Sequence, residues 1–395
     1  MKEHIYLDHA ATTPLDKSVL NKMMPYFTEV FGNANSQHYF GRQAAIAVDE
    51  ARDYIAKQIG AKPSEIYFTS GGTEADNWAL KGTAKQYQKK GKHIIITKIE
   101  HAAMIASAKE LEKDGFEISY LSVDEFGKVD LEQLKSLIRP DTIFIGIMMA
   151  NNEIGTIQPI EEASKIAKEH KIIFFTDAVQ AAGSLKIDVS NGNIDLLSFS
   201  GHKFNGPKGI GVLYIKTGVL IGKLISGGHQ ERTRRGGTTN VPAIVGIAEA
   251  FKIATENMDE KNAYVKNLRD TFIERVIKEI PSVKLNGHRY NRLPNNANFS
   301  FEFVEGESIL FSLDLKGIAV SSGSACSSGS LEASHVLLAT GMSEGLSHGS
   351  IRFTFGKDNT MEEVNYTVDT LKEIIVKLRK MSPLFKLEKG EIKNV

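Results

Sequence analysis

The sequence has little of several features that would direct it to particular classes of protein. It holds one cysteine, Cys326, so no disulfide can form within the chain, which favours a reducing compartment. Lysine plus arginine number 48 and aspartate plus glutamate also number 48, so no excess of positive charge draws the chain to nucleic acid or to an anionic membrane. We therefore expect a cytoplasmic protein whose partners are small molecules or other proteins.

Long apolar runs and targeting segments are also missing. The longest apolar stretches, such as 143–150, are far shorter than the ~20 residues that cross a bilayer, so no membrane segment is expected. The first residues lack the apolar core and the cleavage site of a secretory signal. There is no internal repeat, and little low-complexity sequence apart from the Ser/Gly-rich stretch 321–330. These absences fit a cytoplasmic enzyme.

An alternation of strand-like and helix-like segments is present instead. The 395 residues exceed the ~250 to 300 at which a single core stops growing, which predicts two domains. Helix-like segments separate most of the apolar runs, so we expect a largely parallel sheet with helices on both faces, joined by an antiparallel strand at 209–215. The runs expected as strands are 66–68, 93–97, 118–123, 142–149, 172–176 and 194–199.

The last third of the chain follows a different pattern. A long helical stretch begins near Val241 and ends before Pro281, and we interpret it as the connector between the domains. Shorter strands and helices follow, ending in a helix over 361–380. This order predicts a smaller α+β domain.

Polar side chains follow five of the six predicted strands. Ligands of open parallel sheets bind outside the carboxyl ends of the strands, so these side chains are expected to share one site. Each cluster alone has an ordinary explanation as a helix cap, a turn or a surface charge, but five clusters at five strand ends favour a binding site. In chain order they are Ser70–Glu74, His101, Asn151–Glu153, Asp177 with Gln180, and Ser200–Lys203.

Lys203 lies in a turn rich in glycine and is a candidate for Schiff-base chemistry, because glycines let the backbone approach a bound group closely. By itself it is better explained as a solvated lysine of a hairpin turn. The residues around it change this interpretation, because together they match pyridoxal 5′-phosphate. The matches are Lys203 for the Schiff base, Asp177 for the pyridine nitrogen, the Gly71–Thr73 turn with Ser200 and His202 for the phosphate, and His101 for the ring face.

Two further positions suggest chemistry. Cys326 lies in Ser321–Ser330, a stretch too small and polar to pack a core, so a mobile loop with a reactive thiol is favoured over a buried filler. Arg352 stands within an otherwise apolar strand, where we favour a bidentate carboxylate clamp. The arginines of 232–235 have a solvated loop as their default explanation, with a phosphate or subunit contact as the alternative.

Together these residues resemble the cysteine desulfurases of the NifS/IscS type. The resemblance implies a class V aminotransferase relative with fold type I of the pyridoxal phosphate enzymes, and a homodimer. It implies a mostly parallel seven-stranded sheet in a large domain over 15–260, and a smaller α+β domain formed by 1–14 and 261–395. The motifs run in family order from about Tyr6 to Leu384: Leu7–Pro14, Ser70–Glu74, Glu100–His101, Asn151–Gly155, Asp177–Gln180, Ser200–Lys203, Arg235–Thr238 and Ser321–Cys326.

The resemblance also implies roles for individual residues. Thr238 is expected to reach the cofactor phosphate of the partner subunit, and no resident metal is expected, although Cys326 could transiently ligate an iron–sulfur cluster. The implied catalytic residues are Lys203, Cys326 and His101. The implied cofactor-binding residues are Gly72, Thr73, His101, Asn152, Asp177, Gln180, Ser200, His202, Lys203 and Thr238, and the implied substrate-binding residues are Asn33, Asn152 and Arg352.

The reaction implied by the resemblance converts L-cysteine to L-alanine and leaves a persulfide on Cys326. In it Arg352 holds the substrate carboxylate, Lys203 moves the Cα proton, and the Cys326 thiolate attacks the substrate sulfur. The sulfur then passes to acceptor proteins such as an iron–sulfur scaffold, with no direct contact to nucleic acid or membrane. Two alternatives stay open, namely another pyridoxal phosphate reaction, such as that of a selenocysteine lyase or an aminotransferase, and a non-catalytic sulfur-relay scaffold.

Overall fold

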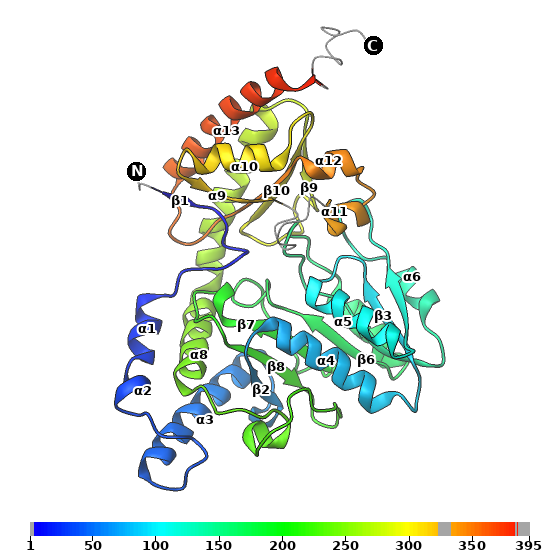
Figure 1. Ribbon diagram of the computed structural model, residues 1–395, viewed down its shortest axis with the longest axis vertical. Helices are drawn as coiled ribbons and strands as arrows, with labels where there is room; N and C mark the ends of the chain where they lie inside the picture. Colours follow the sequence, from blue (N-terminus) through cyan, green and yellow to red (C-terminus); the bar gives the residue numbers. More distant parts are fainter. Residues whose placement is uncertain (1–3, 323–332, 384, 386–395) are drawn as a thin grey trace.

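A seven-stranded sheet forms the centre of the larger part of the protein in this computed structural model, which describes residues 4–322, 333–383 and 385 (Figure 1). Six of its strands run in the same direction, and β8 pairs antiparallel with both β2 and β7. The predicted parallel sheet with one antiparallel strand after Lys203 is confirmed. In spatial order the strands are β2 (Ile66–Thr69), β8 (Gly211–Ile215), β7 (Leu196–Ser200), β6 (Ile173–Asp177), β5 (Thr142–Gly146), β3 (His93–Thr97) and β4 (Glu117–Leu121).

Helices pack on both faces of this sheet because its central strands are apolar on both sides. Ile94 and Ile96 of β3 belong to an apolar cluster with residues of α4 and α5, whereas Ile95 belongs to a separate cluster that includes residues of α3, α6, α7 and α8. α3 ends at Gly60, which adopts a φ of 71° that glycine tolerates at little cost. The bounds are α3 (Tyr39–Ile59), α4 (Gly72–Tyr87), α5 (Ala102–Lys113), α6 (Leu131–Leu137), α7 (Ile160–Glu169) and α8 (Val241–Glu256).

A second sheet forms the smaller part, at the top of Figure 1. In the described ranges it has four antiparallel strands, in the order β12 (Ser321–Ser322), β13 (Ser350–Thr354), β10 (Asn296–Phe301) and β9 (Val283–Asn286). Three helices pack against it through an apolar cluster that includes Phe272, Phe299 and Phe353. They are α9 (Met258–Glu279), α10 (Gly306–Asp314) and α13 (Met361–Met381). The predicted smaller α+β arrangement is confirmed.

The N-terminal segment joins the smaller part. β1 (Ile5–Tyr6) pairs parallel with β11 (Ile318–Ala319), and Leu7 is buried in the same cluster as Phe272. The predicted division at residue 260 falls in the first turn of α9 and stays a prediction. The remaining short helices of the described residues are α1 (Lys17–Met23), α2 (Pro25–Thr28), α11 (His335–Ala339), α12 (Glu344–His348) and the 3₁₀ turns η1 (Pro63–Glu65), η2 (Gly201–Lys203) and η3 (Gln230–Thr233).

No helix of the described residues has the character of a membrane span. Within residues 4–322, 333–383 and 385, none combines the length and the apolar composition that crossing a bilayer requires. The long helices α3, α9 and α13 each carry charged residues along their length.

Candidate active site

A cavity of about 320 Å³ lies at the carboxyl ends of the large-sheet strands, with β13 of the small sheet forming part of its wall. It brings together side chains from all five of the predicted strand-end clusters. Ten predicted site residues line it: Gly72, Thr73, His101, Asn152, Asp177, Gln180, Ser200, His202, Lys203 and Arg352. Residues separated by up to 280 positions in the chain therefore share one site, as the strand-end argument requires.

Lys203 is held at the cavity wall by the N-terminal segment. Its Nζ donates hydrogen bonds to the carbonyl oxygens of Ala10 and Ala11 at 2.6 and 2.8 Å. The predicted turn is the 3₁₀ turn η2, and it packs so closely that a Cβ added to Gly206 would lie 2.7 Å from the carbonyl oxygen of Gly201. Glycine is therefore required where the chain folds back, and the close turn fixes the amine against the cavity.

Asp177 ends β6 and is buried, with 5% of its surface exposed. Its carboxylate accepts a hydrogen bond from the backbone N–H of Val179 at 2.8 Å. Burial raises its pKa, while the neighbouring His101, the N–H of Val179 and Lys203 act in the opposite direction. A buried carboxylate on a cavity wall favours a cationic partner, so this residue fits the protonated ring nitrogen of pyridoxal 5′-phosphate.

His101 caps α5 and lines the cavity. Its Nδ1 accepts a hydrogen bond from the backbone N–H of Ala103 at 3.2 Å, so the neutral ring carries its proton on Nε2. Burial lowers the pKa of the imidazole, with the positive charge of Lys203 adding to the effect. His101 therefore both caps a helix and lines the cavity, and its predicted role at a cofactor stays a prediction. A neutral flat ring is suited to cover the face of an aromatic cofactor.

The opposite end of the cavity has groups that suit a phosphate. The first N–H groups of a helix lack partners within the helix, and α4 begins in the cavity wall at Gly72 and Thr73. A Cβ on Gly72 would lie 2.8 Å from Val179 Cγ2, which explains glycine at this position. Ser200 and His202 stand beside this turn, and burial followed by the charge of Lys203 lowers the pKa of His202 to about 4.

Arg352 projects from β13 and is almost fully buried. Its Nη1 donates to the carbonyl oxygen of Asn152 and its Nη2 to Asp8 Oδ1, both at 2.9 Å. Among the described residues its Nε has no hydrogen-bond partner. An orphaned donor on a guanidinium that lines the cavity fits a carboxylate ligand. Asp8, in the N-terminal segment, therefore holds the side chain of Arg352. This contact was not predicted.

Three further carboxyl groups of the described residues are buried beside these side chains, and the sequence had assigned them no role. Asp76 lines the cavity and accepts from Ser198 Oγ at 2.6 Å. Burial, followed by the charge of Asp177, holds the pKa of Asp76 well above its usual range. Burial raises the pKa of Glu100 to about 8, and it also raises the pKa of Glu153. Burial thus favours the protonated form of each of these three acids. A lone acid on an apolar helix face was the available signal for Asp76.

Three predicted site residues lie elsewhere. Thr238 lines a separate cavity of about 220 Å³ together with Ser70 and Arg235. Asn33 is exposed between α2 and α3, where its Oδ1 accepts from the backbone N–H of Asn35 at 3.0 Å. Cys326 lies outside the described residues. The predicted roles of these three residues stay predictions.

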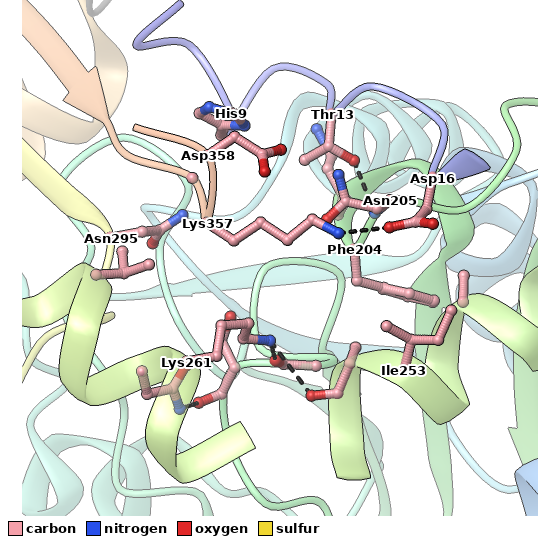
Figure 2. A pocket seen from close by; sticks show the side chains of 18 of the residues that line it. His9, Thr13, Asp16, Phe204, Asn205, Ile253, Lys261, Asn295, Lys357 and Asp358 are labelled. Atoms are coloured by element: carbon pink, nitrogen blue, oxygen red, sulfur yellow. Dashed lines mark hydrogen bonds and ion pairs between the residues drawn. The ribbon is translucent and has the colours of Figure 1, made fainter. Parts of the chain in front are cut away.

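Lys203 also lines a second, smaller cavity of about 80 Å³. Figure 2 shows this cavity with Asp16, Lys261 and Lys357 labelled. Lys357, from the loop before α13, forms an ion pair with Asp16 before α1. This bond chiefly lowers the pKa of Asp16 to about 2. Lys261 donates to the carbonyl oxygens of Gly183 and Ala254. Both lysines of this cavity are therefore already paired within the protein.

The chain is similar to known proteins over most of its length. The family model described as aminotransferase class-V matches residues 5–367. The chain is 56% identical over 383 residues to cysteine desulfurase IscS of Dictyoglomus turgidum, covering 97% of both proteins. It is 53% identical over 380 residues to cysteine desulfurase IscS of Methanosarcina thermophila, covering 96% of this chain and 94% of the relative.

Solved structures give the same result. A NifS-like protein matches with a TM-score of 0.89 and 39% identity, covering 95% of this chain and all of that chain (100%). SspA in complex with cysteine matches with a TM-score of 0.80 and 36% identity, covering 90% of this chain and 100% of that chain. The predicted fold type is thereby confirmed. The chain therefore belongs to the class-V aminotransferases and, within them, to the pyridoxal 5′-phosphate-dependent cysteine desulfurases of the IscS type.

Proposed function

We propose that the protein converts L-cysteine to L-alanine and collects the sulfur as a persulfide on Cys326. The observation that carries this proposal is the convergence of Lys203, Asp177 and Arg352 on one cavity. A relative named as a cysteine desulfurase at 56% identity supports the choice of substrate. A selenocysteine lyase or an aminotransferase could use the same three groups, so the thiol of Cys326 is what distinguishes the proposed reaction.

Each end of the cavity would hold a different part of the cofactor. Asp177 would pair with the ring nitrogen, His101 would cover the ring face, and Thr73 with Ser200 would hold the phosphate. Gln180 lies beside them and donates through Nε2 to the carbonyl oxygen of Ala10 at 3.0 Å. When bound, pyridoxal 5′-phosphate supplies an electron sink that stabilises negative charge at the substrate Cα.

The protein's own groups then position the substrate and move protons. Arg352 binds the substrate carboxylate, for which its Nε is the donor left without a partner among the described residues. Lys203 Nζ, held beside the carbonyls of Ala10 and Ala11, takes and returns the Cα proton. His101 has its ring proton on Nε2 and can pass it toward the substrate.

Sulfur transfer requires a thiolate, and the family resemblance assigns this role to Cys326. The thiolate forms an S–S bond to the substrate sulfur while the Cβ–S bond breaks. The electron pair of the broken bond stays with the carbon skeleton, which gains a proton and leaves as L-alanine. The described strand β12, at Ser321–Ser322, pairs with Ile351 and Arg352 of β13. The described part of the chain that precedes Cys326 therefore ends beside the proposed carboxylate subsite.

We also propose a homodimer. Seven large apolar side chains of residues 20–46 are at least 42% exposed, and an apolar gathering of this kind on a surface marks a protein interface. These side chains are Leu20, Met24, Phe27, Phe31, Tyr39, Phe40 and Ile46. Phe27→Asp with Phe40→Asp is expected to give monomers in analytical ultracentrifugation, whereas Tyr290→Asp, at an 81% exposed site outside this range, should not. A wild-type monomer at micromolar concentration would contradict the proposal.

The sulfur acceptor is proposed to be a protein, such as an iron–sulfur scaffold, and the compartment the cytoplasm. Both proposals rest on the family resemblance. A persulfide is a covalent carrier that exchanges with another thiolate, so the acceptor is expected to present a cysteine. Transfer of labelled sulfur from the loaded enzyme to a purified scaffold protein tests this step directly.

The reaction is tested with two variants. Cys326→Ala is expected to keep the visible absorbance of bound cofactor but to release no sulfide from L-cysteine, and mass spectrometry of the wild type should show one added sulfur on Cys326. Lys203→Ala should lose both the characteristic absorbance and turnover, whereas Lys208→Ala, an exposed lysine of the same turn, should keep them. Undiminished sulfide release by Cys326→Ala would refute the desulfurase mechanism. A wild type that stays colourless with added cofactor would favour a sulfur-relay scaffold.

A further inference from the structure

The main-chain carbonyls of the loop that follows β5 accept hydrogen bonds from the smaller part of the protein. Four consecutive carbonyl oxygens, those of residues 152–155, each accept a hydrogen bond from the smaller part of the protein. The donors are Arg352 Nη1 to Asn152 at 2.9 Å, Asn296 Nδ2 and Asn298 Nδ2 to Glu153 at 3.1 and 3.0 Å, Arg292 Nη2 to Ile154 at 2.7 Å, and Leu293 N to Gly155 at 2.9 Å. A loop of the large domain is therefore fastened to the small one along its whole length.

The N–H groups of the same loop are satisfied from within the large domain. Asn151 Oδ1 accepts from the N–H groups of Glu153 and Ile154 at 2.9 and 3.0 Å, and Asn151 Nδ2 donates to the carbonyl oxygen of Ile99 at 2.9 Å. The carbonyl groups of the loop are thus bonded to the small domain, and its N–H groups to the large domain. Since buried carbonyls that lose their donors carry a desolvation penalty, the loop has one favoured position relative to both.

Asn298 is the best-placed of the small-domain donors. It is fully buried in β10 and lies directly opposite Arg352 in the β10–β13 register. Its amide orientation is fixed because Asn298 Oδ1 accepts from Asn286 Nδ2 at 2.8 Å, which leaves Nδ2 directed at the Glu153 carbonyl. The side chain therefore joins β10, the strand paired with the one that carries Arg352, to the loop that carries Asn152.

We propose that Asn298, assisted by Asn296, is a positioning residue that sets the spacing between Asn152 and Arg352 and thereby the affinity for the substrate carboxylate. The inference rests on the proposed function, in which these two side chains form the carboxylate subsite. Asn298 contacts neither cofactor nor substrate itself. It acts through the Glu153 carbonyl, one peptide unit away from the carbonyl that Arg352 holds.

The test compares two ligands that differ only by the carboxylate. L-Alanine and ethylamine are titrated into the holoenzyme, and binding is followed by the change in visible absorbance. Asn298→Ala is expected to weaken L-alanine binding about tenfold, the loss of about one buried hydrogen bond, and to leave ethylamine binding within about twofold. The KM for L-cysteine should rise with little change in kcat. Ser300→Ala is the matched control, because Ser300 is on the same face of β10 and bonds to Asn286 and Met342 but not to the loop.

Asn296→Ala carries the same test if Asn298→Ala fails to fold, since Asn296 donates to the same carbonyl. Equal weakening of both ligands, or the same loss of L-alanine affinity in Ser300→Ala, would overturn the inference. A wild type that binds L-alanine no tighter than ethylamine would also overturn it. Failure of the proposed function is seen separately as a wild type that releases no sulfide from L-cysteine, because the ratio of the two affinities needs no turnover.

Discussion

The ion pair between Arg52 of α3 and Glu231 of η3 offers the sharpest test of how the loop near Thr238 is held. Two guanidinium nitrogens of Arg52 meet the two carboxylate oxygens of Glu231, each at 2.9 Å, and the side chains are 9% and 8% exposed. Glu231 Oε2 also accepts from the backbone N–H of Phe68 at 3.0 Å. The pair therefore joins a helix, a sheet edge and the loop that carries Arg235.

Breaking this pair should cost much more than breaking a pair on the surface. Arg52→Met would leave the Glu231 carboxylate buried with the N–H of Phe68 as a remaining donor, and an uncompensated buried charge of this kind costs about 3 to 5 kcal/mol. The double variant Arg52→Met with Glu231→Met removes both charges and is expected to recover about half of that loss or more. The double variant is thus expected to be about 2 kcal/mol more stable than Arg52→Met alone.

Urea denaturation followed by circular dichroism measures these differences, and limited proteolysis reports on the loop itself. The expected result is faster cleavage within 223–238 in Arg52→Met than in the double variant. Lys135→Met is the matched control, because Lys135 and Glu132 form an exposed pair with 51% and 81% of their side chains accessible. Exposed pairs contribute about 0.2 to 1 kcal/mol. If Arg52→Met costs no more than Lys135→Met, the reasoning is refuted.

Other predictions test the core, the buried acids and the loop after β5. Burial raises the pKa of Glu100 to about 8 from 4.5, so the folded protein keeps a proton that the unfolded chain loses. The free energy of unfolding should therefore fall as pH rises between these values. The Tm of Glu100→Gln should rise relative to that of the wild type from pH 5 to 8, and a constant difference in Tm would contradict this. Phe272→Ala should cost about 3 to 5 kcal/mol in urea denaturation, because Phe272 is fully buried, and a loss below about 1 kcal/mol would be inconsistent with its packing. Gly155→Ala should weaken L-alanine binding, since φ is 77° and the new Cβ would lie 2.8 Å from Asn296, whereas Gly192→Ala, with 3.7 Å of clearance, should not; equal effects would argue against the clash.

The large sheet could be predicted because its strands are continuous apolar runs bounded by polar residues. His93–Thr97 was predicted and is β3, and the strand that precedes Lys203 differs from its prediction by only two residues at the start and one at the end. The site followed from the same pattern, since the carboxyl ends of parallel strands meet at one edge. Lys203 alone does not indicate a binding site, because a lysine in a glycine-rich turn is ordinarily solvated. The indication comes from Asp177 and His101 at neighbouring strand ends.

The grip of the small sheet on the loop after β5 could not be predicted. Asn298 and Glu153 are about 145 positions apart, and their contact depends on the register of β10 against β13, where a slip of one residue would turn Asn298 to the other face. The local sequence around Asn298 shows only an alternation of asparagine and apolar residues. The contact of Arg352 with Asp8 has the same origin, because it needs a strand and the N-terminal segment to meet across the chain.

The pairing of β1 with β11 has a consequence for synthesis on the ribosome. The strand partners of Ile5 and Tyr6 are synthesised about 310 residues later. At about 5 to 20 residues per second, this delay is on the order of 15 to 60 s. The intervening large sheet can form in that time, but the carbonyls of Ala10 and Ala11 that hold Lys203 are tethered to a strand that still lacks its neighbour. We expect the lysine to reach its final position only after Ile318 has emerged, so cofactor capture would come as one of the last events of chain maturation.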